Sequence, residues 1–269
     1  MDFSALRLIE NETERVSALY KIFNEDSRLN RSKAARVEFL TTVRYVEQYL
    51  KQDAKIIDIG AGAGEYSLYF AKQGYSITAV ELAEENITAF KKKIASDLDI
   101  DLRQGNACNL SEFDDNSFDV VLLLGPLYHI SNPFDREKCI QEAHRVCKKG
   151  GIIFFAYISN DMVILTETFS YDLDYLKNGN YNKETFDVNN FPFVFFTVEE
   201  ARNELIQSSG FNLLKEIAVD GVSELLAEKI NQLDDEGFEH YLKYHFYCCE
   251  KPEMLGRSNH LLFIGGKHD

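Results

Sequence analysis

The chain has 269 residues, 45% of them hydrophobic, and a formal charge of −15 at pH 7. This length and composition predict one large α/β domain with elaborations rather than two full domains. The negative charge argues against nucleic acid as the main partner, because a phosphate backbone would be repelled. No apolar run approaches the roughly 20 residues that cross a bilayer, so we expect no membrane insertion and a cytoplasmic location.

The cysteines do not form a metal-binding or disulfide pattern. They are odd in number and scattered, which is typical of a reducing compartment; they are Cys108, Cys139, Cys147, Cys248 and Cys249. His245 lies close to the last two, but no second CxxC or HxxxH accompanies them. We therefore predict no metal site.

Residues 1–50 have a helical pattern. Apolar side chains recur at steps of three and four residues, as at Phe39, Val43 and Val46. This is the period of one helix face. We expect an N-terminal helical cap over residues 1–50, with a break near residues 24–27.

Residues 51–157 alternate short apolar runs with amphipathic segments. The expected strands are 55–59, 76–81, 100–104, 118–124 and 151–157, and the expected helices are 65–72, 84–96 and 135–147. Apolar strands separated by helices indicate a doubly wound parallel sheet that is covered on both faces. We expect the ligand-binding core of the protein in this segment.

The alternation lapses after residue 157. Residues 158–196 are rich in Tyr, Phe, Asp and Asn, and we expect them to form a helical, aromatic cap or lid. The segment 197–269 returns to the core, with a helix over 198–208 and strands over 211–219 and 260–264. A helical insertion is expected at about 220–250.

A glycine loop follows the first expected strand. Gly60, Gly62 and Gly64 lie between the run Ile56–Ile59 and a helical pattern. Glycine lets the backbone turn sharply and approach a ligand closely, and the positive end of the next helix favours a carboxylate or phosphate. Glu81 ends the next strand, where an acidic side chain can accept hydrogen bonds from ribose hydroxyls. Together these features predict an adenosine-containing ligand with an anionic end.

Two cofactors compete for this loop. A dinucleotide fingerprint has glycine at its first, third and sixth positions, but the sixth position counted from Gly60 is Glu65. A carboxylate there would repel a pyrophosphate. S-adenosylmethionine carries a sulfonium and an ammonium group, which tolerate acidic neighbours such as Asp58. This cofactor is favoured, and an NAD-dependent oxidoreductase remains the alternative.

At this point the sequence resembles the class I S-adenosylmethionine-dependent methyltransferases, especially the small-molecule type related to quinone-biosynthesis methyltransferases. The matching pieces occur in the expected order at residues 58–64, 79–82, 105–107, 115–121, 125–129 and 145–151. The resemblance implies a Rossmann-like sheet of seven strands, mostly parallel, with an antiparallel last strand. It also implies methyl transfer from S-adenosylmethionine to a small-molecule acceptor, which leaves S-adenosylhomocysteine.

The resemblance further implies a set of cofactor-binding residues, namely Asp58, Gly60, Ala61, Gly62, Gly64, Glu81, Leu82, Asn106, Ala107, Leu124 and Gly125. Asn106 departs from the commoner aspartate, but an amide can still accept from and donate to an adenine ring. For Asp58 the alternative is that it only fixes the glycine loop, and the sequence leaves both roles open.

Methyl transfer is an in-line displacement that needs alignment and, for some acceptors, removal of a proton. The candidates for the proton acceptor are His129 and Tyr128, and His129 has the alternative of packing within its loop. Tyr20, Arg36 and Tyr128 are candidate acceptor-binding residues. The nucleophile of the acceptor (O, N or C) stays open. A catalytically silent S-adenosylmethionine-binding scaffold is the alternative from another functional class.

Overall fold

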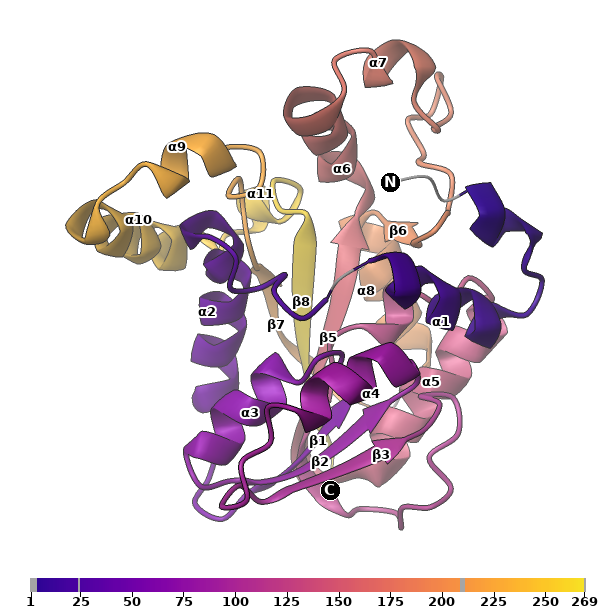
Figure 1. The fold of residues 1–269 in the computed structure, drawn as a ribbon, viewed down its shortest axis with the longest axis vertical. Coiled ribbons are helices and arrows are strands. Elements are labelled where there is room, and N and C mark those ends of the chain that lie inside the picture. Colours follow the sequence, from indigo (N-terminus) through magenta and orange to yellow (C-terminus); the bar gives the residue numbers. More distant parts are fainter. Residues whose placement is uncertain (1–3, 24, 209–210, 269) are drawn as a thin grey trace.

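The computed structural model describes residues 4–23, 25–208 and 211–268 (Figure 1). Residues 1–3 and 24 of the expected N-terminal cap, like 209, 210 and 269, lie outside the described residues. Among the helices that are described, none has the length and apolar character needed to span a bilayer.

One mixed sheet forms the centre of the molecule. Its strands are β1 Lys55–Ile59, β2 Ser76–Glu81, β3 Ile100–Gln104, β4 Phe118–Leu123, β5 Cys147–Ser159, β6 Phe195–Phe196, β7 Phe211–Ala218 and β8 His260–Lys267. The order is β3-β2-β1-β4-β5-β8-β7, with the short β6 beside β5. The neighbours from β3 to β5 are parallel, whereas β8 runs antiparallel to both β5 and β7. This confirms the expected mostly parallel sheet with an antiparallel last strand, to which β6 is an addition.

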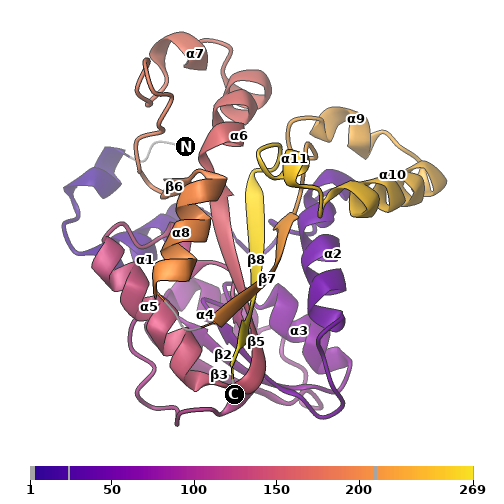
Figure 2. The same ribbon diagram turned by 180° about the vertical axis from the view of Figure 1, so that it is seen from behind.

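Helices cover both faces of this sheet. Figure 1 shows α2 (Lys33–Glu47), α3 (Glu65–Lys72) and α4 (Glu84–Lys91) on one face. The reverse view shows α5 (Pro133–Val146) and α8 (Val198–Ser208) on the other (Figure 2). Side chains of β1 and β4 such as Ile57 and Val121 are fully buried between the layers, which explains why these strands are apolar at successive positions.

The remaining elements gather at the carboxyl edge of the parallel strands (Figure 1). They are η1 Ser4–Leu8, α1 Glu12–Ile22, η2 Pro126–Tyr128, α6 Asn160–Thr166, the π-helix η3 Glu167–Tyr171, α7 Tyr175–Asn178, α9 Ala227–Asn231, α10 Asp235–Cys248 and α11 Pro252–Leu255. Several begin with a capping side chain: Asn11 accepts from Glu14 N, and Asp234 accepts from Gly237 N. Such caps satisfy the first N–H groups of a helix. The N-terminal helices and the two later insertions therefore converge above one edge of the sheet.

The strands and helices expected at named bounds agree with the structure to within three residues at each end, except for two elements that differ by more. The helix expected over 84–96 ends at Lys91, because Lys93 N turns back to Phe90 O and the Lys93 side chain pairs with Asp26 and Glu65. The strand expected over 151–157 extends to Cys147–Ser159, because β8 and β4 pair with it along this length. In both cases partners distant in the sequence set the boundary.

Candidate functional site

The glycine loop lies between β1 and α3, at the carboxyl edge of the sheet. Its three glycines have positive φ values of +75°, +55° and +85° at Gly60, Gly62 and Gly64, a region that L-residues with a side chain adopt at a cost. A Cβ at Gly60 would lie 2.7 Å from Pro126, and one at Gly64 would lie 2.3 Å from Phe90. These two glycines are therefore required by close packing of the loop within the protein itself.

Gly62 makes the contacts that join the loop to its neighbours. Its N–H donates to Glu81 Oε2 at 2.7 Å, and a Cβ added to it would lie 3.2 Å from the Glu25 side chain of the N-terminal segment. Glu81 Oε1 accepts from Ala83 N at 2.8 Å. Burial raises the pKa of Glu81, which is only 4% exposed, whereas the backbone hydrogen bonds from Ala83 and Gly62 lower it. Oε1 also accepts from Asn86 Nδ2 at 3.3 Å, so Oε2, which accepts from Gly62 alone, is the oxygen with a lone pair for a further donor.

Asp58 is buried at the end of β1 and holds the first turn of α3. Its Oδ2 accepts from Ser67 Oγ at 2.7 Å. Burial raises the pKa of Asp58 to about 7, while the bonds from Ser67 lower it. This geometry supports the loop-fixing role of Asp58, one of the two roles that the sequence left open.

Glu65 does not act as the sequence argument supposed. Its carboxylate pairs with Lys93 Nζ at 2.7 Å and accepts from Asn30 Nδ2. Lys93 also contacts Asp26 Oδ1 at 2.7 Å. A neutralised carboxylate repels a pyrophosphate far less than an isolated one, so this step of the argument against a dinucleotide is wrong.

The ends of β2 and β3 carry the residues expected near an adenine. Asn106 is exposed beyond β3, and its Oδ1 accepts from Cys108 N at 2.9 Å in a tight turn. Ala107, the next residue, and Leu82, which follows β2, are both half-buried. Gln104 Nε2 donates to Leu82 O at 3.2 Å, which ties the two strand ends together.

The loop after β4 lies directly beside the glycine loop. A Cβ on Gly125 would lie 3.5 Å from Gly60 O, as expected from the pairing of β1 with β4. Tyr128 Oη donates to Leu124 O at 2.8 Å. Burial raises the pKa of Tyr128, so its hydroxyl keeps its proton and fixes the Leu124 carbonyl.

His129 is only 8% exposed and is bound to the N-terminal segment. Its Nε2 lies 2.8 Å from Tyr20 Oη. Burial and the Arg28 cation lower the pKa of His129 to about 3, so the ring is neutral. Its Nδ1 is buried and has no hydrogen-bond partner among the described residues.

A cavity of about 860 Å³ opens beside this loop; we call it the cap cavity. Its wall comes from the N-terminal segment, the η2 loop, the 158–196 insertion and the segment 220–260, and it includes Tyr20, Arg28, Tyr128, His129 and His260. The aromatic residues of the insertion that line it are Tyr171, Tyr175, Phe191, Phe193 and Phe195. Among the expected acceptor-binding residues, Tyr20 and Tyr128 line the cavity, but Arg36 does not; it is exposed on α2. Glu38, two residues further along α2, lines the cavity instead.

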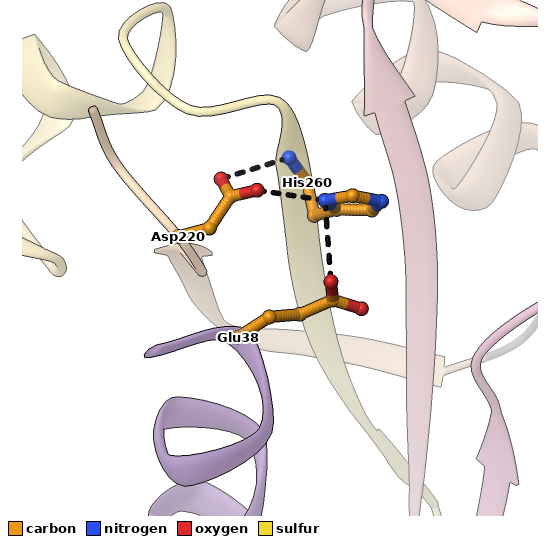
Figure 3. A group of neighbouring side chains, drawn as sticks. All are labelled: Glu38, Asp220 and His260. Carbon is orange, nitrogen blue, oxygen red and sulfur yellow. Dashed lines mark hydrogen bonds and ion pairs between the residues drawn. The ribbon is translucent and has the colours of Figure 1, made fainter. Parts of the chain in front are cut away.

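Glu38, Asp220 and His260 form a cluster in this wall that the sequence did not indicate (Figure 3). His260 Nδ1 lies 2.7 Å from Asp220 Oδ2 and 3.6 Å from Glu38 Oε2. Arg28 donates to both oxygens of Glu38, at 2.6 and 3.0 Å, and its Nε lies 2.8 Å from Glu25 Oε1. The three ligand atoms lie within 4.8 Å of one another, but a metal would have to displace the bidentate arginine. These side chains therefore form a network of paired opposite charges rather than a metal site.

The segment that holds this site is similar in sequence to a known family of proteins. Residues 57–155 match the model of the methyltransferase domain family. This segment holds the glycine loop, Glu81 and the loop after β4. The core of this chain is a class I S-adenosylmethionine-dependent methyltransferase domain. The cofactor of such a domain is S-adenosylmethionine.

One similar protein is the ubiquinone biosynthesis O-methyltransferase of Maricaulis maris. It is 38% identical to this chain over 106 residues, which cover 39% of this chain and 41% of that protein. The match thus spans less than half of the relative's length.

Solved structures share the fold over most of the chain. An S-adenosylmethionine-dependent methyltransferase from Thermotoga maritima is 20% identical with a TM-score of 0.58, over 93% of this chain and 98% of that one. The cyclase SpnF is 17% identical with a TM-score of 0.61, over 95% and 97% of the two chains. Because one of these neighbours is a cyclase, the fold alone does not fix the reaction.

Proposed function

We propose that this protein transfers a methyl group from S-adenosylmethionine to a small-molecule acceptor that binds in the cap cavity. The main support for the proposal is that the cap cavity adjoins the glycine loop. Glu25 lines the cap cavity and also lies against Gly62 of the glycine loop, while Tyr128 lines the cavity and holds the Leu124 carbonyl. An acceptor in the cavity is thereby brought next to the glycine loop.

The residues of the glycine loop fit the cofactor in their donor and acceptor chemistry. Glu81 is a buried carboxylate whose Oε2 can accept from a ribose hydroxyl, and its long 3.3 Å bond from Asn86 leaves Oε1 as a second acceptor if that bond is exchanged; Gly62 allows close approach of the backbone. We assign the remaining contacts to the residues expected from the family, with Asn106 and Ala107 at the adenine and Gly125 beside the sulfur. When bound, the cofactor supplies a methyl group on a sulfonium that an aligned nucleophile displaces in line.

We assign positioning roles to the two residues first considered as proton acceptors. Tyr128 donates its hydroxyl hydrogen to Leu124 O and has a raised pKa. His129 is so deeply buried that its charged form is disfavoured, which makes it a poor acceptor of a proton. Both side chains instead shape the wall between the cofactor site and the cap cavity.

Calorimetric titration tests the cofactor site first. We expect S-adenosylmethionine and S-adenosylhomocysteine to bind with micromolar-class affinity and NAD to bind far more weakly. Glu81→Ala is expected to raise the dissociation constant at least tenfold, about 1.4 kcal/mol, because the ribose hydroxyls lose their acceptor. Glu84→Ala is the matched control, since Glu84 is exposed at the start of α4.

Transfer of a labelled methyl group to a panel of phenols, amines and ketones tests the reaction itself. Product with any member, lost in Glu81→Ala and kept in Glu84→Ala, supports the proposed function. Cofactor binding without methyl transfer to any member favours the silent scaffold. Equal or tighter binding of NAD contradicts the proposal altogether.

A further inference from the structure

His260 occupies a place in the cap cavity that the proposed cofactor chemistry does not use. It is the first residue of β8 and pairs with Ile158 near the carboxyl end of β5. Its ring lies 6.5 Å from the ring of Tyr128, centroid to centroid, and Tyr128 in turn holds the loop after β4. His260 and Tyr128 therefore line the same cavity, close to each other.

The ring of His260 is held firmly in one orientation. Nδ1 lies 2.7 Å from Asp220 Oδ2, and the His260 backbone N–H donates to Asp220 Oδ1 at 3.1 Å. Asp220 is itself 5% exposed and accepts from Ser258 Oγ at 2.6 Å. Figure 3 shows Asp220 and Glu38 around Nδ1, with the second ring nitrogen pointing away from both carboxylates. Nε2 is thus the atom that remains for a molecule in the cavity.

The charged groups around His260 decide what Nε2 can do. Asp220 follows β7, Glu38 and Arg28 come from α2 and the segment before it, and Tyr128 comes from η2. Burial lowers the pKa of His260, but Glu38 and Asp220 outweigh this effect and raise it to about 9. At neutral pH Nε2 therefore carries a hydrogen and donates. Above the pKa, Asp220 retains the hydrogen on Nδ1, and Nε2 becomes an acceptor.

A second imidazole donor lies on the other side of Tyr128. The His129 ring is 5.1 Å from the Tyr128 ring. Burial raises the pKa of Tyr20, so its hydroxyl keeps its proton; we infer that it donates this proton to His129 Nε2, which lies 2.8 Å away. The single hydrogen of the neutral His129 ring then sits on Nδ1, which has no partner among the described residues. A buried donor without a partner is costly, and a ligand oxygen would satisfy it.

The rest of the wall defines the charge and shape of the molecule that fits. Five carboxylates and three arginines line the cavity, so a charged His260 leaves one carboxylate in excess. This balance disfavours an anionic ligand. Phe193 packs 5.1 Å from His129 and 6.3 Å from Tyr128, between ring centroids, and gives the wall flat aromatic surfaces. The wall suits an uncharged, planar molecule.

We propose that His260 recognises the methyl acceptor by donating Nε2–H to an uncharged oxygen, and that the acceptor is a neutral aromatic molecule bearing a carbonyl or hydroxyl group. This inference rests on the proposed function, because it names the substrate class of the same site. His260 determines specificity here, while methyl transfer takes place at another atom of the acceptor, nearer Gly125.

The test measures binding of acetophenone to the protein saturated with S-adenosylhomocysteine. Benzoate is the matched anionic probe, since it has nearly the same shape. We expect acetophenone to bind at least fivefold more tightly than benzoate, by calorimetry or ligand-observed NMR. Saturation with S-adenosylhomocysteine is verified separately, so failure of the cofactor site is distinguished from failure of this proposal.

Three variants test whether acetophenone binding depends on His260. His260→Phe should weaken acetophenone binding at least fivefold and leave the affinity for S-adenosylhomocysteine within twofold. His260→Gln supplies an amide N–H and should retain most of the binding. His240→Phe, at an exposed position of α10, is the control and should bind like the wild type.

The pH dependence separates hydrogen-bond recognition from a merely structural role. Acetophenone does not ionise, so its binding should weaken as the pH rises through about 9, where Nε2–H is lost. Asp220→Asn removes a charge that favours the imidazolium, and the loss should then move to lower pH. His260→Gln should show no such dependence, because an amide does not titrate. The affinity for S-adenosylhomocysteine reports whether each variant is folded.

Several results would overturn the proposal. These are equal affinity of wild type and His260→Phe for acetophenone, tighter binding of benzoate than of acetophenone, and no acetophenone binding to a protein that binds S-adenosylhomocysteine. A requirement for added Zn²⁺ or Mg²⁺ would do so as well, since it would make the cluster of Glu38, Asp220 and His260 a metal site. Binding that persists in excess chelator supports the proposal.

Discussion

The two halves of the site are built in different ways. The cofactor side consists mainly of backbone: Gly62 N–H meets Glu81, and Gly60 N–H meets Val80 O, within one β-α-β unit. The half that we propose for the acceptor, here called the acceptor side, consists of side chains that meet from distant parts of the chain, such as Tyr20 with His129 and Glu38 with His260. A site made mainly of backbone suits a cofactor that a whole family shares, because its shape depends little on side chains. A site made of side chains can change by substitution to fit a different acceptor.

The halves also differ in packing. The strands below the glycine loop are fully buried, as at Ile57 and Val121, whereas the cap has large apolar side chains in solvent, among them Phe169 and Leu173. Regions with few buried contacts open more easily. We therefore expect substitutions on the cofactor side to affect stability and those on the acceptor side to affect binding.

The largest effect is expected for Gly64→Ala. The new Cβ would lie 2.3 Å from Phe90, and φ at this position is +85°, so overpacking and backbone strain add. We expect the free energy of unfolding to fall by about 4 kcal/mol and cofactor binding to be lost, as measured by urea denaturation and calorimetry.

Gly74→Ala is the matched control for this prediction. Gly74 has φ of +91°, but an added Cβ meets nothing within 4 Å, so only the backbone strain of about 1 kcal/mol remains. Equal destabilisation by the two substitutions would show that packing against Phe90 does not constrain the loop.

Asp58→Asn is expected to change how stability depends on pH. The pKa of Asp58 is raised from 3.8 to about 7 in the folded protein, so between these values the folded state binds more protons than the unfolded state. Its contribution to the free energy of unfolding therefore falls as pH rises through this window. Asparagine removes this slope, and the variant should gain about 2.5 kcal/mol relative to wild type between pH 5 and pH 8.

Thermal or urea unfolding at several pH values measures this difference. Asp53→Asn is the control, because Asp53 is an exposed carboxylate close by in the chain. Parallel pH profiles for Asp58→Asn and wild type would show that Asp58 is not a carboxyl with a raised pKa.

The smallest effect is expected at the junction of the two halves. Lys93 joins Asp26 of the N-terminal segment to Glu65 of α3. Lys93→Met should lower the free energy of unfolding by less than about 1 kcal/mol and should speed dissociation of S-adenosylhomocysteine two- to fivefold, because the segment over the glycine loop is less well held. Stopped-flow displacement measures this rate, with Lys92→Met, at an exposed neighbour, as the control. Identical dissociation rates for both variants would show that holding the N-terminal segment through Lys93 does not slow cofactor release.

The sequence was most informative where the signal is local. Short apolar runs and amphipathic helical patterns predicted the strands and helices of residues 51–157, since each element is encoded by its own residues. It was less informative where distant partners intervene: α4 ends early beside Lys93, and β5 is extended by its neighbours. The pairing of Glu65 with Lys93 likewise altered an electrostatic argument that was sound for an isolated carboxylate.

The sequence by itself determined the methyltransferase core, because three glycines, a strand-end carboxylate and their spacing specify a backbone shape that few other residues can form. The tertiary structure alone decided the wall of the cap cavity. Glu38, Asp220 and His260 carry no motif and lie far apart in the chain, and the inward turn of Glu38 in place of Arg36 depends on how α2 docks. Side-chain constellations of this kind exist only once the layers have packed.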